Sequence, residues 1–294
     1  MLVRPLILAL LLASPTFAID TNKLCPEATP EPGTPAGKVT EHTFAESKIF
    51  PGTTRKYWVY VPAQYDAKTP AAVMVFQDGQ WYQDPKGGWR VPAVFDALIH
   101  KKEMPVTVGV FIQPGEFPNQ VDKGGKPRQN RSFEYDTLSD QYARFLEVEM
   151  LPEVAKSWAI RGDSSGRAIC GISSGGICAF TVAWEKPKLF SKVLSHVGSF
   201  TNIRGGNAYP DLVRKADPKP IKVFLHDGTN DLINRAGDWW QANEAMYAAL
   251  TEKNYDVDFL KDRGFHAYWS CGIRLPEALR RTWKDRPAAA EAPR

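Results

Sequence analysis

The segment Gly171-Ile172-Ser173-Ser174-Gly175 carries the strongest chemical signal in the sequence. A G-x-S-x-G pattern between a strand and a helix forms a sharp turn that lifts the serine hydroxyl above a sheet. A short apolar run precedes the segment and a helix-compatible run follows it. Ser174 is the competing nucleophile, but Ile172 stands two residues before it, where the pattern has glycine. We therefore predict that Ser173 is the nucleophile.

A serine hydroxyl at neutral pH needs a general base, and the base needs an acid that orients it. Behind a turn of this kind the chain order is Ser, then Asp or Glu, then His. Four histidines either precede the serine or belong to predicted core strands: His42, His100, His196 and His226. His266 follows in a loop before the last predicted helix, so we predict that it is the general base.

Two aspartates after the predicted strand 221–226 compete for the role of the acid. Asp227 directly follows the strand, and Gly228 favours a turn that points its side chain elsewhere. Asp231 lies further round the loop, where a carboxylate can reach back to the imidazole. We favour Asp231, whose role would be to hold the tautomer of His266, and keep Asp227 as the alternative.

An acyl-transfer intermediate also needs backbone N–H donors for its oxyanion, each typically worth about 3–4 kcal/mol. The N–H of Ser174, at the start of the predicted helix 174–184, is one candidate. The other donor normally comes from the loop after the third strand. That loop is Gln77-Asp78-Gly79-Gln80, and the N–H of Gln80 is the second candidate.

Strand-like and helix-like segments alternate along the chain, which predicts an α/β fold with a mostly parallel sheet and helices on both faces. We expect the strands before residue 71 to pair antiparallel at one edge, and one domain over 40–284. The predicted strands are 55–61, 71–76, 106–112, 167–170, 192–196, 221–226 and 257–260. The predicted helices are 92–99, 136–158, which Pro152 would kink or end, 174–184, 241–250 and 275–283.

The two ends of the chain differ from its middle. Residues 1–18 combine a basic start, a short apolar run and a small residue at Ala18, which predicts a signal peptide and a secreted or periplasmic product. Residues 19–39 are rich in proline and predict a flexible linker, and 285–294 predict a disordered tail. No later run reaches the roughly 18 apolar residues of a transmembrane helix, so we expect no membrane span in the mature chain.

Composition and spacing argue against several classes of partner. The formal net charge is only +4 and basic pairs such as Lys101-Lys102 are isolated, so we expect no nucleic acid. We also expect no metal and no cofactor, because no histidines have helical ligand spacing and no C-x-x-C pair occurs. The four cysteines are expected to be small buried apolar residues, although export would permit disulfides.

Four motifs together resemble the esterase family of α/β-hydrolases that includes enterochelin esterases and feruloyl esterases. They are Phe76-Gln77-Asp78-Gly79, Gly171 to Gly176, Gly228-Thr229-Asn230-Asp231 and Gly264-Phe265-His266. The resemblance implies the α/β-hydrolase fold, a triad of Ser173, Asp231 and His266, and an oxyanion hole from the backbones of Gln80 and Ser174. It further implies that the stretch Asn130 to Tyr135, with Arg131 and Glu134, lines or braces the site.

Several aromatic residues lie in loops on the predicted catalytic side, namely Trp81, Tyr82, Trp89 and Trp269. They either form a platform for a substrate group or pack the loop layer; we carry Trp81 and Trp269 as candidate substrate contacts. The leading hypothesis is a secreted serine esterase that hydrolyses a small-molecule or saccharide carboxylic ester through an acyl-enzyme. Acyl transfer to another alcohol and a catalytically idle binding module are the alternatives. The oligomeric state stays open.

Overall fold

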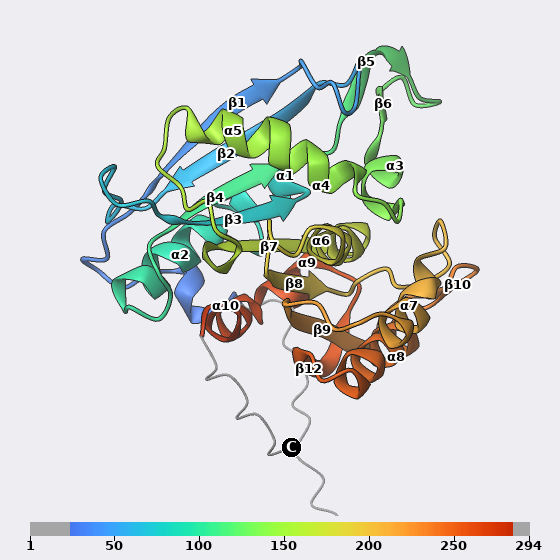
Figure 1. Cartoon of the computed structure of the whole chain (residues 1–294). Coiled ribbons are helices and arrows are strands. Elements are labelled where there is room, and N and C mark those ends of the chain that lie inside the picture. The colour runs from blue at the N-terminus through green and yellow to red at the C-terminus, as the bar shows by residue number, and fades with distance from the viewer. Residues whose placement is uncertain (1–23, 285–294) are drawn as a thin grey trace, which may run out of the picture.

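The computed structural model describes residues 24–284, and one large sheet runs through the middle of this part of the chain (Figure 1). Within the described residues, its eight strands follow the order β1-β2-β4-β3-β7-β8-β9-β12. The strands are β1 Lys38–Phe44, β2 Arg55–Val61, β3 Ala72–Gln77, β4 Thr107–Ile112, β7 Arg167–Ile172, β8 Lys192–His196, β9 Lys222–Asn230 and β12 Asp256–Phe265. In this sheet, β4, β3, β7, β8, β9 and β12 pair parallel with their neighbours. At one edge, β2 pairs antiparallel with β4, and β1 pairs antiparallel with β2. The predicted sheet is confirmed.

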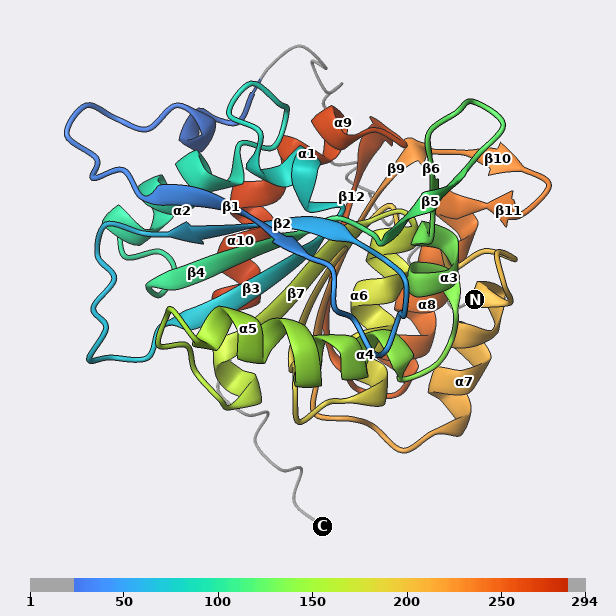
Figure 2. The same cartoon turned by 90° about the horizontal axis from the view of Figure 1, so that it is seen from above.

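Helices cover both faces of this sheet, as Figures 1 and 2 show. They are α1 Gly79–Gln83, α2 Val91–His100, α3 Arg131–Asp136, α4 Gln141–Phe145, α5 Leu151–Ala155, α6 Ser174–Glu185, α7 Tyr209–Lys215, α8 Trp239–Glu252, α9 Tyr268–Gly272 and α10 Leu275–Trp283. The predicted α/β fold with helices on both faces is therefore confirmed.

The side chains of β3 alternate between two hydrophobic cores. Val73 and Val75 belong to the core that α6 and α8 cover. Met74 and Phe76 belong to the opposite core, which contains residues of α2 and α10. Because both faces are covered, the strand is a nearly unbroken apolar run in the sequence.

The predicted single helix over 136–158 is divided in the structure. It consists of α4, a π-helical segment over Leu146–Met150 and α5, and it ends at Ala155. A proline lacks the N–H and its ring meets the carbonyl four residues back. Just before Pro152, the N–H of Leu151 donates to the carbonyl of Leu146, five residues back. This wider turn makes room for the proline ring, so the helix continues through Pro152.

The predicted flexible linker over 19–39 packs against the fold at residues 25–28. Residues Pro26–Ala28 form a short 3-10 turn, and Cys25 and Ala28 are buried in the core that contains α2. Small apolar side chains in a proline-rich segment leave no periodic pattern, which is why the sequence favoured a linker. The predicted signal peptide 1–18, residues 19–23 and the predicted tail 285–294 lie outside the described residues, and the bounds of the 40–284 domain stay a prediction.

Short elements that the sequence did not predict follow the carboxyl ends of the parallel strands. The hairpin β5 Glu116–Val121 and β6 Pro127–Gln129, together with α3, follows β4. A second hairpin, β10 Ile233–Asn234 and β11 Gly237–Asp238, follows β9, and α9 follows β12. Sites in open α/β sheets lie at this edge.

Two further expectations can be compared with the structure. All four cysteines are buried and free, so they are the small buried residues that we expected. Among residues 24–284, no helix has the length and apolar character needed to cross a membrane.

Candidate active site

Ser173 occupies a strained turn between β7 and α6. Its φ of 60° and ψ of −122° are rare for a residue other than glycine. A Cβ on Gly171 would lie 2.1 Å from the carbonyl oxygen of Gly175, and a Cβ on Gly175 would lie 3.2 Å from the Cβ of Gln77. The turn therefore needs a glycine at Gly171, and a side chain at Gly175 would press on Gln77. The Ser173 N–H donates to the carbonyl of His196 over 3.0 Å, which ties the turn to β8.

The side chains of Ser173, His266 and Asp231 form one chain of hydrogen bonds. His266 Nε2 lies 2.8 Å from Ser173 Oγ, and His266 Nδ1 lies 2.6 Å from Asp231 Oδ1. A carboxylate only accepts, so Nδ1 carries the proton and Nε2 is left to accept the serine hydroxyl. The structure thus brings together the three side chains that the sequence predicted as a triad.

The pairing of β9 with β12 positions the histidine and its carboxylate. Asn230, the last residue of β9, pairs with Phe265, the last residue of β12, so Asp231 and His266 leave the sheet side by side. A Cβ on Gly228 would lie 2.3 Å from the carbonyl oxygen of Gly264. The two strands can approach this closely because Gly228 lacks a Cβ.

Asp227, the alternative acid, points into the protein. It is fully buried, and its oxygens accept from the Gly228 N–H at 2.6 Å and from Asn243 Nδ2 at 2.8 Å. Burial, followed by the hydrogen bond and the charge of Asp231, raises the pKa of Asp227 to about 10. At neutral pH Asp227 is therefore an uncharged acid, and of the two aspartates it is Asp231 that contacts His266.

The two predicted oxyanion donors lie at the starts of neighbouring helices. Ser174 is the first residue of α6 and Gln80 the second residue of α1, and N–H groups of a first turn have no acceptor in their own helix. A Cβ on Gly175 would also lie 3.3 Å from Asp78 Oδ2, so the two turns are in contact. Their role in binding an oxyanion stays a prediction.

Helix α3 braces this arrangement from one side. Arg131 Nε and Nη2 each donate to a carboxylate oxygen of Asp78 over 2.7 Å. Asp78 has a φ of 58° and precedes α1, so Arg131 holds the turn that carries Gln80. Burial raises the pKa of Asp136 at the end of α3, and hydrogen bonds from Ser174 and Ser132 act against this shift.

Glu134, a predicted substrate contact, does not reach the surface of the site. Its carboxylate is buried and accepts from Arg55 Nη1 at 2.7 Å and from Arg55 Nη2 at 2.9 Å. Asn130 donates to the same carboxylate over 3.0 Å. Its position corrects the predicted contact to a brace between α3 and β2.

The four aromatic residues of the predicted platform divide into two pairs. Tyr82 and Trp89 are fully buried and pack against each other, with ring centroids 4.5 Å apart. Trp81 is 43% exposed and stacks on Tyr268 of α9, with ring centroids 6.5 Å apart. Trp269 is half-buried and lies beside Phe265. Only Trp81 and Trp269 are accessible, so they remain the candidate substrate contacts.

His196 and His226, at the ends of the predicted core strands, form a separate buried network. Their Nδ1 atoms lie 3.1 Å apart, and His226 Nε2 lies 3.1 Å from Asp262 Oδ2. Burial, and then the charge of His226, hold the pKa of His196 well below its ordinary value. Cys271 lies beside both rings, with potential ligand atoms of the three residues within 4.8 Å of one another. The hydrogen bonds occupy both His226 nitrogens, and the absence of a metal stays a prediction.

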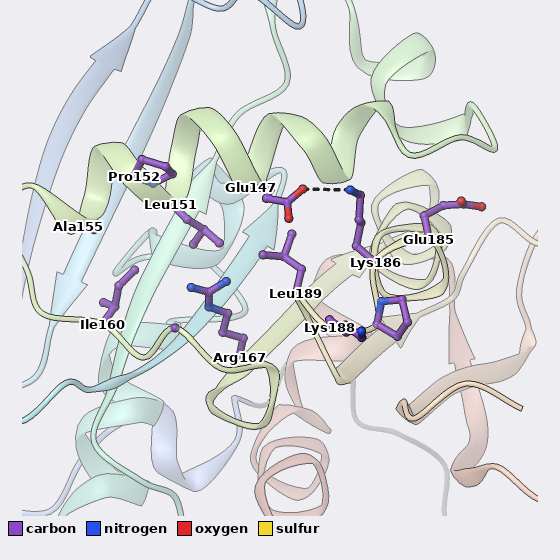
Figure 3. A pocket seen from close by; sticks show the side chains of 12 residues that line it. Glu147, Leu151, Pro152, Ala155, Ile160, Arg167, Glu185, Lys186, Lys188 and Leu189 are labelled. Carbon is purple, nitrogen blue, oxygen red and sulfur yellow. Dashed lines mark ion pairs between the residues drawn. The ribbon is translucent and has the colours of Figure 1, made fainter.

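A cavity of about 590 Å³ lies at the end of the sheet away from Ser173. Figure 3 shows the side chains that line it. Its lining includes Arg167, the first residue of β7, whereas Ser173 follows the last residue of that strand. Lys186 and Glu147 form an ion pair of 3.1 Å across it. Its lining contains no serine, cysteine or histidine, so it is not the candidate active site.

Sequence reasoning missed two residues that touch the triad. Ser199 lies 3.2 Å from Ser173 Oγ, and the ring of Trp239 packs edge-on against His266, with centroids 5.6 Å apart. Neither residue belongs to a recognisable motif. The only signal in the sequence was the position of Ser199, a polar residue that follows Gly198 shortly after the predicted strand 192–196.

Residues 47–264 match the sequence family described as "Putative esterase". Among curated proteins, an endo-1,4-beta-xylanase/feruloyl esterase of Xylanibacter ruminicola is 25% identical over 129 residues. These residues make up 44% of this chain and 14% of that protein.

Solved structures of esterases share the fold. The enterobactin esterase of Shigella flexneri superposes with a TM-score of 0.67 at 19% identity, covering 89% of this chain and 63% of that one. The ferric enterobactin esterase of Salmonella typhimurium has a TM-score of 0.69 at 22% identity, and the match covers 89% of this chain and 62% of that one. A ferulic acid esterase of Anaeromyces mucronatus has a TM-score of 0.69 at 17% identity, and the match covers 91% of this chain and 98% of that one. These likenesses support the fold, and the family match spans most of the sequence: the chain belongs to the esterase family, with the α/β-hydrolase fold.

Proposed function

We propose that this chain hydrolyses a carboxylic ester through an acyl-enzyme, with Ser173 as nucleophile, His266 as general base and Asp231 as the orienting acid. The observation that carries the proposal is the hydrogen-bond chain from Ser173 Oγ through both nitrogens of His266 to Asp231. Membership of the esterase family supports the same reaction class.

In this mechanism Ser173 Oγ attacks the ester carbonyl while its proton passes to His266 Nε2. The carboxylate of Asp231 stabilises the imidazolium that forms. His266 then gives the proton to the leaving alcohol, and a water molecule repeats the sequence to release the acid. The N–H groups of Gln80 and Ser174 would stabilise the oxyanion in both halves.

The proposed substrate is a small-molecule or saccharide ester, and no cofactor is needed. The similar structures include esterases named for enterobactin and for ferulic acid. Trp81 and Trp269 offer accessible aromatic surface for the substrate. Arg131 is partly exposed, and Asp78 engages only its Nε and Nη2. The signal-peptide pattern of residues 1–18 supports secretion or export to the periplasm.

A substrate panel with purified wild-type protein and Ser173→Ala tests this proposal. The panel contains short-chain nitrophenyl esters, acetylated sugars, feruloyl esters and catecholate siderophores. We expect wild-type hydrolysis of at least one class and a loss of about 10⁴-fold or more in Ser173→Ala, because triad residues act as a unit. Thermal unfolding checks that the variant is folded. Turnover retained by a folded Ser173→Ala protein would contradict the proposal, and transfer to an added alcohol would indicate an acyltransferase.

A further inference from the structure

Ser199 contacts the nucleophile from a loop that contributes nothing else to the triad. Its Oγ lies 3.2 Å from Ser173 Oγ, and its backbone N–H donates to the carbonyl of Ser173 over 3.1 Å. Ser199 is fully buried and follows the end of β8. Its hydroxyl is therefore a fixed neighbour of the attacking oxygen.

Trp239 sets the direction of the hydrogen bond between the two serines. Its Nε1 lies 3.1 Å from Ser199 Oγ, and an indole N–H can only donate. Ser199 Oγ therefore accepts from Trp239 and must direct its own proton elsewhere. The oxygen that lies within reach is Ser173 Oγ, so Ser199 donates to the nucleophile.

The loop that carries Ser199 is held in a strained conformation. Val197, a β-branched residue, has a φ of 43°, and its N–H donates to the carbonyl of His226 over 2.7 Å. A Cβ on Gly198 would lie 2.5 Å from Ser195 Oγ and 2.7 Å from the ring of Phe200, so a side chain there would displace one or both of them. Asn243 Nδ2 donates to the carbonyl of Gly198 over 2.9 Å. Strain of this kind persists only where surrounding contacts hold it.

We propose that Ser199, oriented by Trp239, is a positioning residue for the nucleophile. Because Ser199 already donates to Ser173 Oγ, the Ser173 hydroxyl has His266 Nε2 as its remaining acceptor. Four groups then donate in one direction, from the Trp239 indole through Ser199 and Ser173 to His266, and the Asp231 carboxylate accepts the last bond. Hydrogen bonds aligned in this way polarise one another. The inference rests on the proposed function.

Ser199 keeps its own proton throughout the reaction. During acylation the Ser173 proton moves to His266, Oγ bonds to the carbonyl carbon and the carbonyl electron pair moves to the oxyanion. The oxyanion pair then re-forms the carbonyl, and the alcohol leaves with the proton from His266. During deacylation water attacks the acyl carbon and gives a proton to His266, after which the bond between that carbon and Oγ breaks and its electron pair returns to Oγ. The Ser199 hydroxyl then donates to an oxygen that gains negative charge, and bonds to charged acceptors are stronger. His266 finally returns the proton to Oγ.

The first test compares Ser199→Ala with Ser195→Ala on the best substrate of the panel. Ser195 is also fully buried beside Gly198, and within the described residues its Oγ has no hydrogen-bond partner. We expect Ser199→Ala to lower kcat about tenfold with little change in KM, as the loss of one hydrogen bond to a reacting oxygen predicts. Ser195→Ala should leave both constants unchanged. An unchanged kcat in folded Ser199→Ala would overturn the inference.

The second test asks whether Trp239 acts through Ser199. We expect Trp239→Phe, which keeps a ring against His266 but loses the N–H, to lower kcat about threefold, because it removes one neutral hydrogen bond. In the Ser199→Ala background the same change should have no further effect, since contacting residues in one network are coupled. Trp283→Phe is the control, because Trp283 Nε1 has no partner among the described residues. Additive losses in the double variant would contradict the orienting role.

A fluorophosphonate probe separates failure of this inference from failure of the proposed function. The probe reacts with an activated serine and needs no known substrate. If wild-type protein is neither labelled at Ser173 nor active on the panel, the proposed function fails. If wild-type protein is labelled at Ser173 and folded Ser199→Ala is labelled at the same rate, the function stands and the role of Ser199 is refuted. A labelling rate about tenfold lower in Ser199→Ala supports both.

Discussion

Two aspartates at the end of β9 differ in what each carboxyl group touches. Asp231 Oδ1 contacts His266 Nδ1 and also accepts the N–H of Leu232 over 2.5 Å. Asp227 is bonded to Asn243 and to the Gly228 N–H, and its raised pKa keeps it uncharged. An uncharged acid cannot stabilise an imidazolium through its charge, so the two residues have different parts in the site.

We therefore predict that Asp231→Asn lowers kcat/KM by about 10³–10⁴-fold, the effect of removing the carboxylate of a serine triad. Asp227→Asn should cost less than about tenfold, because an amide resembles the neutral acid that it replaces. Steady-state kinetics of the two variants measured side by side check this. A larger loss at Asp227, with both proteins folded, would reassign the acid.

At the scale of elements, the site depends on how closely three backbone turns approach. The turn from β7 into α6 contacts the turn from β3 into α1, and β9 meets β12 at Gly228 and Gly264. Helix α3 holds the turn from β3 into α1 through Arg131 and anchors itself to β2 through the buried pair of Glu134 and Arg55. Breaking a buried pair typically costs about 3–5 kcal/mol, so this brace is a structural requirement of the site.

We predict that Gly171→Ala destabilises the protein by about 3 kcal/mol or more, because its Cβ would overlap the backbone of Gly175. Backbone atoms cannot move aside without distorting the turn. Gly162→Ala is the matched control, since a Cβ at Gly162 meets nothing within 4 Å. It should change the free energy of unfolding by less than about 1 kcal/mol. Urea unfolding of both variants gives the comparison. Equal free energies of unfolding in the two variants would show that a Cβ at Gly171 causes no costly overlap.

At the scale of the whole molecule, the buried Asp227 couples global stability to pH. Burial, and then Asp231, raise its pKa in the folded protein to about 10, whereas an aspartate in an unfolded chain titrates near about 4. Between these values the folded protein holds a proton that the unfolded chain releases. The contribution of Asp227 is therefore fully present below about pH 4 and is lost as the pH rises towards about 10.

We predict that Asp227→Asn removes this dependence. On raising the pH from about 6 to about 9, the free energy of unfolding of wild-type protein should fall relative to that of the variant, by at most about 1.4 kcal/mol for each pH unit. Urea unfolding at several pH values measures the difference. Asp211→Asn, at an exposed position of α7, is the control. Its plot of unfolding free energy against pH should run parallel to that of wild type. An Asp227→Asn curve parallel to wild type would mean that Asp227 is charged when buried.

The sequence by itself determined the features that local chemistry controls. The unbroken apolar run 71–76 identifies β3 as a strand covered on two faces, and β2, β8 and α10 have the predicted bounds. The glycines around Ser173 mark the turn, because only residues without a Cβ fit where two backbone segments touch. The order of serine, aspartate and histidine along the chain left two aspartates, and the loop position favoured Asp231, which the structure brings together with Ser173 and His266.

The tertiary structure decided which side chains meet across long stretches of chain. Ser173 and His266 are 93 positions apart, and their contact depends on the pairing of β9 with β12. The buried position of Glu134 and the contact of Ser199 with Ser173 follow from how α3 and the loop after β8 pack. Neither packing leaves a periodic pattern in the residues concerned. Sequence patterns record the environment of each segment, whereas the partners of a polar side chain are set by neighbours that only folding brings near.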